Sequence, residues 1–328
     1  MSESLSAVRF IIATFLFFIF SSNAFSVETE MSAEQVLARL SQAMREQNYQ
    51  GVVTYEHGGR LETMQATHLV LDGVEFESYS HLNGPERQHA RMGRLVSCQT
   101  LGGQLLSGGK FAAGAAIARF HDHYQFYVKG YDRVAGRKVV VMQILPKDNF
   151  RYGISLGVDV ESGVLLKYLV MQPNRALERI QFVAFELDPK FSPDEIASIT
   201  ANARGLQPCA EPEPQAQVPE ALSEWMPSWA PPGFVHVSSK RTDQDGIVHT
   251  YTDGLASYSV FINSEVVASD DESARIPQGA AQRGATLVIM SLQASGEKVV
   301  HVAVVGEVPQ LTAAQVVKSV SLTKTATN

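Results

Sequence analysis

The chain has 328 residues, of which 45% are hydrophobic, and a formal net charge of -7. A mildly acidic chain without a basic run is a poor candidate for binding nucleic acid, so that class of partner is excluded. The length is large for a single hydrophobic core and is typical of two domains.

The first 24 residues have the composition of a cleavable signal peptide. Arg9 supplies a positive charge, residues 10–20 form an uncharged apolar run, and Ser22 and Ala24 are small residues at the expected cleavage position. The run is shorter than the roughly 20 apolar residues that a membrane span needs. We therefore expect cleavage near Ala24 and a mature protein outside the cytoplasm; an uncleaved membrane anchor is the alternative.

Cys98 and Cys209 are the two cysteines of the chain. An exported protein can form a disulfide between them. They either form that bond or stay two separate thiols, because their spacing alone does not show that they meet.

The mature part begins with a predicted helix over 32–48. Ser32 and Gln35 have the spacing of a capping box, in which each side chain bonds a free backbone N–H of the first turn. One buried face is indicated by apolar residues at helical spacing: Val36, Leu37, Leu40, Ala43 and Met44. The pattern then changes to period two, and Gly58-Gly59 predicts a hairpin turn.

Strand-like runs continue for more than a hundred residues. They cover 74–80, 124–134, 138–146, 151–160, 163–171 and 177–187. Consecutive long strands joined by tight turns predict a large, curved, antiparallel sheet. The first helix and the Gly/Ala-rich segment 110–120 are available to plug it. A helix over 192–205, with Ser192 as its cap and Glu195 completing the box, ends this domain.

A Pro/Glu-rich stretch over 206–219 predicts an extended linker that few contacts cross. The expected division is therefore a signal peptide over 1–24, a first domain over 25–205, this linker, and a smaller β/α domain over 220–328. Strands of the smaller domain are predicted at 234–241, 246–253, 255–263, 285–293 and 297–308. A last helix is predicted to be capped by Thr312 and Gln315.

The stretch "HTYTDGLASYSVFIN" brings His249, Asp253, Ser257 and Ser259 close together in sequence. These are the residue types of a serine-hydrolase triad, which is identified by geometry and not by proximity in sequence. Asp253-Gly254 predicts a two-residue hairpin turn, and Ser257 is not on a nucleophile elbow. A hydrolase is therefore the weakest functional hypothesis.

No cofactor or metal is expected. His121 and His123 lie on one side of an extended chain, but no third or fourth ligand is identifiable by spacing. They are interpreted as part of a solvated turn, and His57 as a turn residue beside Gly58.

The apolar residues of the large sheet are the candidate binding residues. They line more concave sheet than two short helices are expected to cover, and such cavities hold apolar ligands in barrel-like folds. The candidates are Leu69, Phe126, Val128, Val141, Ile144, Leu156, Leu166 and Phe182. For any single one of them, an ordinary core residue is the better interpretation.

Several blocks resemble the RseB/MucB family of periplasmic regulators of sigma-E. In the second domain these are "WAPPGFVHVSSKR", "YTDGLASYSVFIN" and "VHVAVVGEVPQLTAAQVVKSV". In the first they are "LARLSQAMREQNYQGVVTYEHGGRLETM", "GRKVVVMQILPKDNFRYG" and "SGVLLKYLVM". The resemblance covers about residues 32–321. One departure is Gly157, which stands where members commonly carry a tryptophan, and which predicts a wider cavity or a bulge.

The resemblance implies an α+β fold whose large domain is similar to the lipoprotein carriers LolA and LolB, an unclosed barrel plugged by helices. It implies a non-enzymatic periplasmic protein that binds the periplasmic part of a membrane-anchored anti-sigma factor, RseA or MucA, and shields it from proteolysis. Lipopolysaccharide or another acylated lipid is the implied releasing ligand. The alternative is a periplasmic lipid or lipoprotein carrier, and a homo-oligomer stays open.

Overall fold

The computed structural model describes part of the chain in detail. The predicted signal peptide, the predicted linker, residues 110–119 of the predicted plug, Cys98 and Cys209 lie outside the described residues, and so do the predictions made for them. The unit Ser32–Asn328 is described below. The described residues are 31–92, 120–205, 225–242, 246–263, 277–295 and 298–322.

Helix α2 (Ala33–Glu46) begins at the predicted capping box. The Ser32 hydroxyl accepts a hydrogen bond from the Gln35 N–H, and the Gln35 side chain accepts one from the Ser32 N–H. The predicted apolar face is buried, with Leu40 fully enclosed. The cap and the apolar spacing predicted this helix because both depend only on residues that are close together in the sequence.

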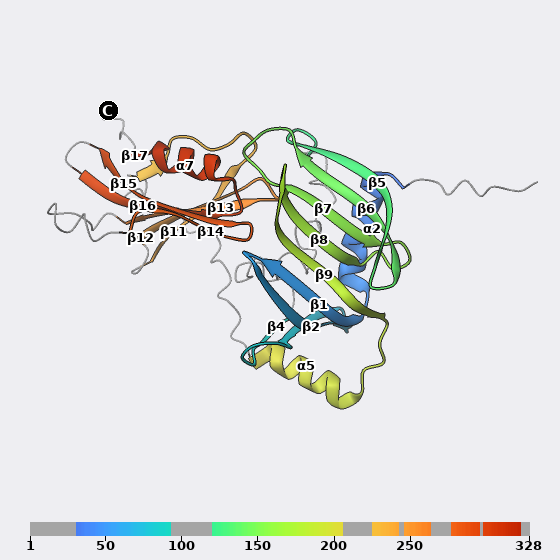
Figure 1. The fold of residues 1–328 in the computed structure, drawn as a ribbon. Helices are drawn as coiled ribbons and strands as arrows, with labels where there is room; N and C mark the ends of the chain where they lie inside the picture. Colours follow the sequence, from blue (N-terminus) through green and yellow to red (C-terminus); the bar gives the residue numbers. More distant parts are fainter. Residues whose placement is uncertain are drawn as a thin grey trace, which may run out of the picture. The chain divides into compact units, whose positions relative to one another are not determined.

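Nine antiparallel strands form the first sheet, in the order β4-β3-β2-β1-β9-β8-β7-β6-β5 (Figure 1). Within the described residues β4 and β5 are the two edges and do not pair with each other, so the sheet is unclosed, which confirms the predicted fold class. The strands are β1 (Tyr49–His57), β2 (Arg60–Leu71), β3 (Val74–His81), β4 (Gln88–Met92), β5 (Tyr124–Val134), β6 (Arg137–Pro146), β7 (Gly153–Asp159), β8 (Leu165–Gln172) and β9 (Arg175–Leu187).

The two faces of this sheet are covered by different helices. On one face His68 bonds through Nδ1 to the carbonyl oxygen of Gln47, the C-cap of α2, at 2.7 Å. On the other face Leu69 packs under α5 (Pro193–Gly205) through Ile196 and Ile199 (Figure 1). The predicted box between Ser192 and Glu195 is confirmed at the start of α5.

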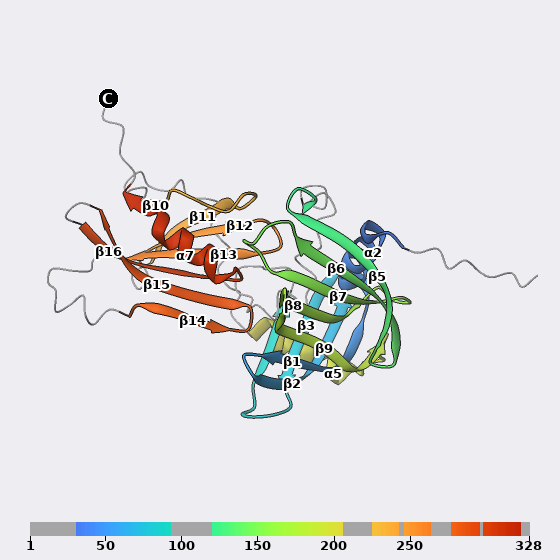
Figure 2. The ribbon, with the colours of Figure 1, turned by 45° about the horizontal axis from the view of Figure 1, so that its top comes forward.

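A separate six-stranded antiparallel sheet forms the smaller C-terminal domain, in the order β11-β12-β13-β16-β15-β14 (Figure 2). Helix α7 (Gln310–Ser319) covers one of its faces along β15 and β16, and Val316 and Val317 lie in the same buried core as Tyr258 and Val260. The strands are β11 (Val235–Thr242), β12 (Gly246–Thr252), β13 (Ser257–Asn263), β14 (Gly279–Arg283), β15 (Thr286–Ser295) and β16 (Lys298–Gly306), beside a small pair of β10 (Trp225–Pro227) and β17 (Val320–Leu322).

Two local predictions in this domain are wrong. Helix α7 starts at Gln310 with Pro309 as its N-cap, so Thr312 lies inside the helix and does not cap it. The connection between β12 and β13 has four residues, Asp253 to Ala256, because Thr252 pairs with Ser257. Thr312 and Asp253 are the side chains that suggested these local roles. Each of them bonds a group outside its own turn.

Candidate functional site

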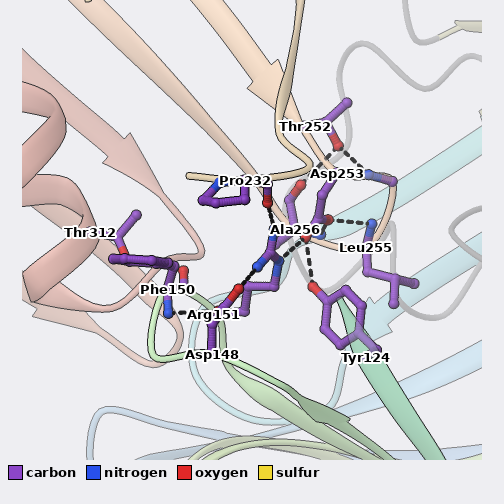
Figure 3. A network of polar contacts seen from close by, with 11 residues as sticks. Tyr124, Asp148, Phe150, Arg151, Pro232, Thr252, Asp253, Leu255, Ala256 and Thr312 are labelled. Atoms are coloured by element: carbon purple, nitrogen blue, oxygen red, sulfur yellow. Dashed lines mark hydrogen bonds and ion pairs between the residues drawn. The ribbon is translucent and has the colours of Figure 1, made fainter. Parts of the chain in front are cut away.

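The loop between β6 and β7 carries a buried arginine, Arg151. Its guanidinium donates from Nε to Oδ2 of Asp253 at 2.7 Å, and it also bonds the Asp148 carboxylate and the carbonyl oxygen of Pro232. The side chains of Arg151 and Asp253 are both almost completely excluded from solvent. Figure 3 shows the guanidinium between these three acceptors, which come from the first sheet's loop and from two turns of the C-terminal domain.

Asp253 accepts hydrogen bonds from four donors at this junction. Oδ1 accepts the backbone N–H groups of Leu255 at 2.9 Å and Ala256 at 2.7 Å, and Oδ2 accepts the Tyr124 hydroxyl at 2.8 Å beside the guanidinium. One carboxylate therefore both shapes its own turn and binds the large sheet (Figure 3). A buried carboxylate is stable when it is paired and its lone pairs are satisfied in this way.

The protonation states at the junction follow from burial and from the Asp253 charge. Burial would lower the pKa of Arg151, but the hydrogen bond and the charge of Asp253 outweigh burial and raise it. Burial, and then the same carboxylate, raise the pKa of Tyr124 well above its usual value. Arg151 is therefore charged and Tyr124 is a neutral donor at every physiological pH.

Three further contacts join the β6–β7 loop to the C-terminal domain. The buried Tyr152 hydroxyl donates to the carbonyl oxygen of Val308 at 2.9 Å. The Thr312 hydroxyl donates to the carbonyl oxygen of Phe150 at 3.0 Å, which is the role this residue has in place of capping. The Phe150 ring also meets the Trp229 ring edge-on at 5.4 Å.

Two glycines allow turns of the C-terminal domain to lie close to the residues that precede β5. Gly233 and Gly254 both have positive φ, at 84° and 95°. A Cβ added to Gly233 would overlap the His123 ring, and one added to Gly254 would lie 2.7 Å from Phe120. His123, which the sequence suggested as half of a metal site, therefore packs against a backbone turn.

Five of the eight predicted apolar candidates share one face of the large sheet. Cross-strand pairing puts Phe126 beside Ile144, and Val128 and Leu156 on either side of Met142. Phe182 continues this face through the β7–β8–β9–β1 pairing, where Leu156 meets Tyr168 and Tyr168 meets Ile180. His68 lies on the same face, so these residues are on the side covered by α2.

The other three candidates are elsewhere. Leu69 lies on the opposite face, under α5. Val141 pairs with Gly157, so both face away from Leu156. Leu166 is buried at a register shift opposite Gly157 and Val158, where the bulge proposed for the glycine is present. That the shared face holds a ligand stays a prediction.

The residues of the suspected triad do not assemble. His249 is completely buried, with Nδ1 at 2.7 Å from the Ser239 hydroxyl and Nε2 at 3.1 Å from the carbonyl oxygen of Trp225. Burial lowers its pKa, so the ring is neutral. The Ser259 hydroxyl bonds Thr250, and Asp253 bonds Arg151. His249 thus holds strands together in the core of the domain.

The remaining histidines also have local partners. His121 lies 3.4 Å from the Glu34 carboxylate and against the Phe126 ring. His57 is the buried end of β1 and bonds Glu62, so its interpretation as a plain turn residue is wrong. Within the part of the chain that the structure describes, no group of three or more His, Cys, Asp or Glu side chains is arranged to hold a metal ion.

Two family models match this chain. The model described as the MucB/RseB N-terminal domain matches residues 32–200, and the one described as the MucB/RseB C-terminal domain matches residues 219–321. The chain belongs to the MucB/RseB family. The segments that contribute Arg151, Pro232, Asp253 and Val308 to the junction all lie inside the blocks that carried the family resemblance in the sequence.

Curated relatives match over almost the whole length. The sigma factor AlgU regulatory protein MucB of Pseudomonas aeruginosa is 30% identical over 302 residues, covering 88% of this chain and 90% of the relative. The sigma-E factor regulatory protein RseB of Escherichia coli K12 is 24% identical over 320 residues, covering 92% and 93%. Both relatives are named as regulatory proteins.

Solved MucB structures have the same fold. MucB in complex with MucA(peri) is 29% identical, with a TM-score of 0.69 over 90% of this chain and all of that one. A second complex, of Pseudomonas aeruginosa MucA and MucB, gives a TM-score of 0.68 at 28% identity, covering 89% of this chain and 99% of that one. MucB alone gives 0.57 at 29% identity, covering 89% and 98%.

Arg151 is the functional residue that sequence reasoning missed. An arginine in a loop gives no periodic signal, and its partner Asp253 was already explained by its own turn. The available signal was the resemblance itself: "KDNFRYG", "PPG" and "TDG" are short polar or glycine-containing blocks at the ends of otherwise apolar strands. The junction around Arg151 couples the two sheets. It contains no nucleophile with an adjacent base and oxyanion donors.

Proposed function

We propose that this chain binds the periplasmic region of a membrane-anchored anti-sigma factor of the RseA/MucA type and thereby restrains a sigma-E type envelope stress response. The observation that carries the proposal is the full-length similarity to MucB, which has been crystallised with MucA(peri). The names of the curated relatives support the same regulatory role. In this proposal the chain is a binding protein without catalytic activity.

The finer proposal is that binding keeps the first stress protease away from the anti-sigma factor. The test is to digest the purified cognate periplasmic segment with that protease, with and without the mature chain. Cleavage should slow in proportion to the fraction bound. A control with equal concentrations of an unrelated exported protein separates shielding from substrate dilution. Unchanged cleavage at saturating chain would contradict this role and favour a carrier.

The proposed release signal is an acylated lipid such as lipopolysaccharide. The apolar face that holds Phe126, Leu156 and Phe182 supports it, since this face lies on the side of the sheet that α2 covers. By linkage, a ligand that prefers the partner-free form must weaken partner binding, by about 5- to 150-fold for a coupling of about 1–3 kcal/mol. Partner affinity measured with and without lipopolysaccharide decides it, and equal dissociation constants would exclude lipid as the switch.

The proposed location is the periplasm, after removal of residues 1–24. No helix among the described residues is long and apolar enough to span a membrane. The proposed domains are 25–205 and 220–328, joined by 206–219, a division with which the ranges of the two family matches agree. N-terminal sequencing of the protein recovered from a periplasmic extract tests the first point, and a product that still carries the apolar run would contradict it.

A lipid or lipoprotein carrier is the second candidate, and the shared apolar face is the observation that favours it. The two functions differ in a transfer assay. A carrier moves labelled acyl lipid from donor to acceptor vesicles catalytically, whereas a lipid-sensing regulator binds lipid without accelerating transfer.

A further inference from the structure

The turn between β14 and β15 contacts the large sheet at a second place, away from Arg151. The Ala285 N–H donates to Oε2 of Glu178 at 3.1 Å, and the Tyr55 hydroxyl donates to Oε1 of the same carboxylate at 2.7 Å. Both Glu178 and Ala285 are buried. Glu178 belongs to β9, so a strand in the middle of the large sheet holds a turn of the C-terminal domain through its carboxylate.

The shape of this turn fits its seat closely. Gly284 has a φ of 60°, in the left-handed region. A Cβ added there would lie 2.9 Å from Oε2 of Glu178 and 3.1 Å from Cβ of His57. The turn therefore lies directly on His57, which is 2% exposed.

The partners of His57 define its protonation state when the turn is seated. The Arg283 Nε–H, which can only donate, points at Nδ1 at 3.2 Å, so Nδ1 carries a lone pair. Nε2 lies 3.1 Å from the Glu62 carboxylate and must carry the proton. The seated turn thus selects a neutral imidazole that accepts from a cation on one side and donates to an anion on the other.

The charged groups around His57 come from five strands. Tyr55 of β1 stacks its ring on the imidazole at 4.2 Å. Glu62 of β2 also lies 3.8 Å from His81 of β3 and 3.5 Å from the Arg283 guanidinium of β14. Glu178 of β9 is the cross-strand partner of His57 and accepts the Tyr55 hydroxyl. All of these groups except Arg283 belong to the large sheet and stay beside His57 whether or not the turn is seated.

We propose that His57 is a proton-operated latch, which holds the β14–β15 turn on the large sheet when neutral and releases it when protonated. Protonation puts a second N–H on Nδ1, where it faces the Arg283 Nε–H, so the hydrogen bond is lost and two positive charges meet at about 3 Å. The carboxylates of the sheet stay beside the ring in both states, and in the seated state Glu62 also faces the Arg283 guanidinium at 3.5 Å. Arg283 is the group that leaves, so it decides the sign: acid favours release.

The size of the effect follows from linkage. Each proton that the released form binds and the seated form does not bind shifts the seated-to-released ratio by up to about tenfold per pH unit, so acid favours release. This inference does not depend on anti-sigma binding, because it concerns the protein alone.

The experiment is hydrogen–deuterium exchange on the full mature chain at pH 7.5 and 5.5, corrected for intrinsic exchange rates. Protection of peptides that contain Ala285 should fall at the lower pH, by up to about tenfold per pH unit. In His57→Gln, whose amide can accept from Arg283 and donate to Glu62 but cannot be protonated, protection should be the same at both pH values. His81→Gln is the matched control, because His81 also faces the Glu62 carboxylate, at 3.8 Å, but from β3, and it should keep the wild-type acid response.

A further variant keeps the test valid if His57→Gln does not fold. Arg283→Met removes the cation that opposes protonation, so its turn should exchange faster at pH 7.5 and no longer respond to acid. Loss of protection in His57→Gln equal to that of the wild type would overturn the latch. So would an acid response that persists in Arg283→Met, or a wild-type turn that is equally protected at both pH values.

Discussion

Arg151 and Asp253 are 102 residues apart along the chain, yet Nε of the first lies 2.7 Å from Oδ2 of the second. Both side chains are buried, so water cannot take the place of either partner. Breaking a buried pair by removing one member is strongly destabilising, because it leaves the other charge uncompensated. The contact therefore makes the large sheet and the C-terminal domain depend on each other for stability.

Replacing Arg151 with methionine should lower the free energy of unfolding by about 3–5 kcal/mol, since Asp253 loses its buried cation. Denaturant titration followed by circular dichroism measures this loss. Arg179→Met is the matched control, because its ion pair with Glu56 is exposed at both ends, and such pairs contribute at most about 1 kcal/mol. Equal losses in the two variants would contradict the assigned importance of the junction.

Cleavage of the chain within 211–219 should leave the first domain and the C-terminal domain associated. The linker composition alone predicted few contacts between them, but Arg151, Tyr152 and Thr312 all bond across. With an engineered protease site in this segment, the fragments should elute together in gel filtration and separate when Arg151 is replaced by methionine. Fragments that separate without the substitution would show that the junction is too weak to hold them.

Gly284→Ala should weaken the seating of the β14–β15 turn for two reasons. The added Cβ would lie too close to Glu178 and His57, and alanine disfavours the positive φ of this position. Gly59→Ala is matched to it, since Gly59 has a φ of 75° but nothing within 4 Å of an added Cβ. Thermal unfolding should show a larger loss for Gly284→Ala, by about 1–3 kcal/mol more than backbone strain alone. Indistinguishable melting curves would mean that the turn shifts freely on its seat.

Asp159→Asn should destabilise the chain in a pH-dependent way. Burial would raise the pKa of Asp159, but hydrogen bonds from Arg137 and Ser162 outweigh it and hold the pKa below its usual value. The stabilisation is therefore present above the unfolded pKa of about 3.9 and is lost as the pH falls through the lower folded value. The gap in unfolding free energy between wild type and variant, about 1.5–3 kcal/mol at pH 7, should close below about pH 4.

Glu161→Gln is the control for that titration. Glu161 bonds the same guanidinium of Arg137 at 2.7 Å but is 76% exposed. Its removal should change stability by less than about 1 kcal/mol at every pH. A gap for Asp159→Asn that stays constant down to pH 2 would show that the carboxylate charge has no part in the effect.

The sequence predicted what depends on neighbouring residues. The capping boxes at Ser32 and Ser192 are in place, because a cap involves groups only three residues apart. The alternation of Tyr258, Val260 and Ile262 with more exposed residues is also confirmed. Leu69 could not be assigned to a face because α5 covers the outer face there and makes it apolar as well. Val141 could not be assigned because it stands in an unbroken apolar run over 139–142, which shows no alternation.

Contacts between distant segments were beyond sequence reasoning. Thr312 resembles a helix cap in sequence but bonds the carbonyl oxygen of Phe150, 162 residues earlier. His57 resembles a turn residue beside two glycines, while its second ring nitrogen meets Arg283, 226 residues later. Neither pairing leaves a periodic or motif-like signal, so only the fold reveals it.

The buried guanidinium of Arg151 also sets an order on the making of the protein. All nine strands of the large sheet are synthesised before Pro232 and Asp253, so the loop must stay hydrated while the first domain forms. The Asp148 carboxylate is already present in the loop, but only the C-terminal turns supply the other two acceptors, the Pro232 carbonyl and the Asp253 carboxylate, that allow Arg151 to dehydrate. Completion of the second domain is therefore the event that finishes the first, and a chain interrupted after residue 205 would keep an open, water-exposed loop that quality-control proteases can enter.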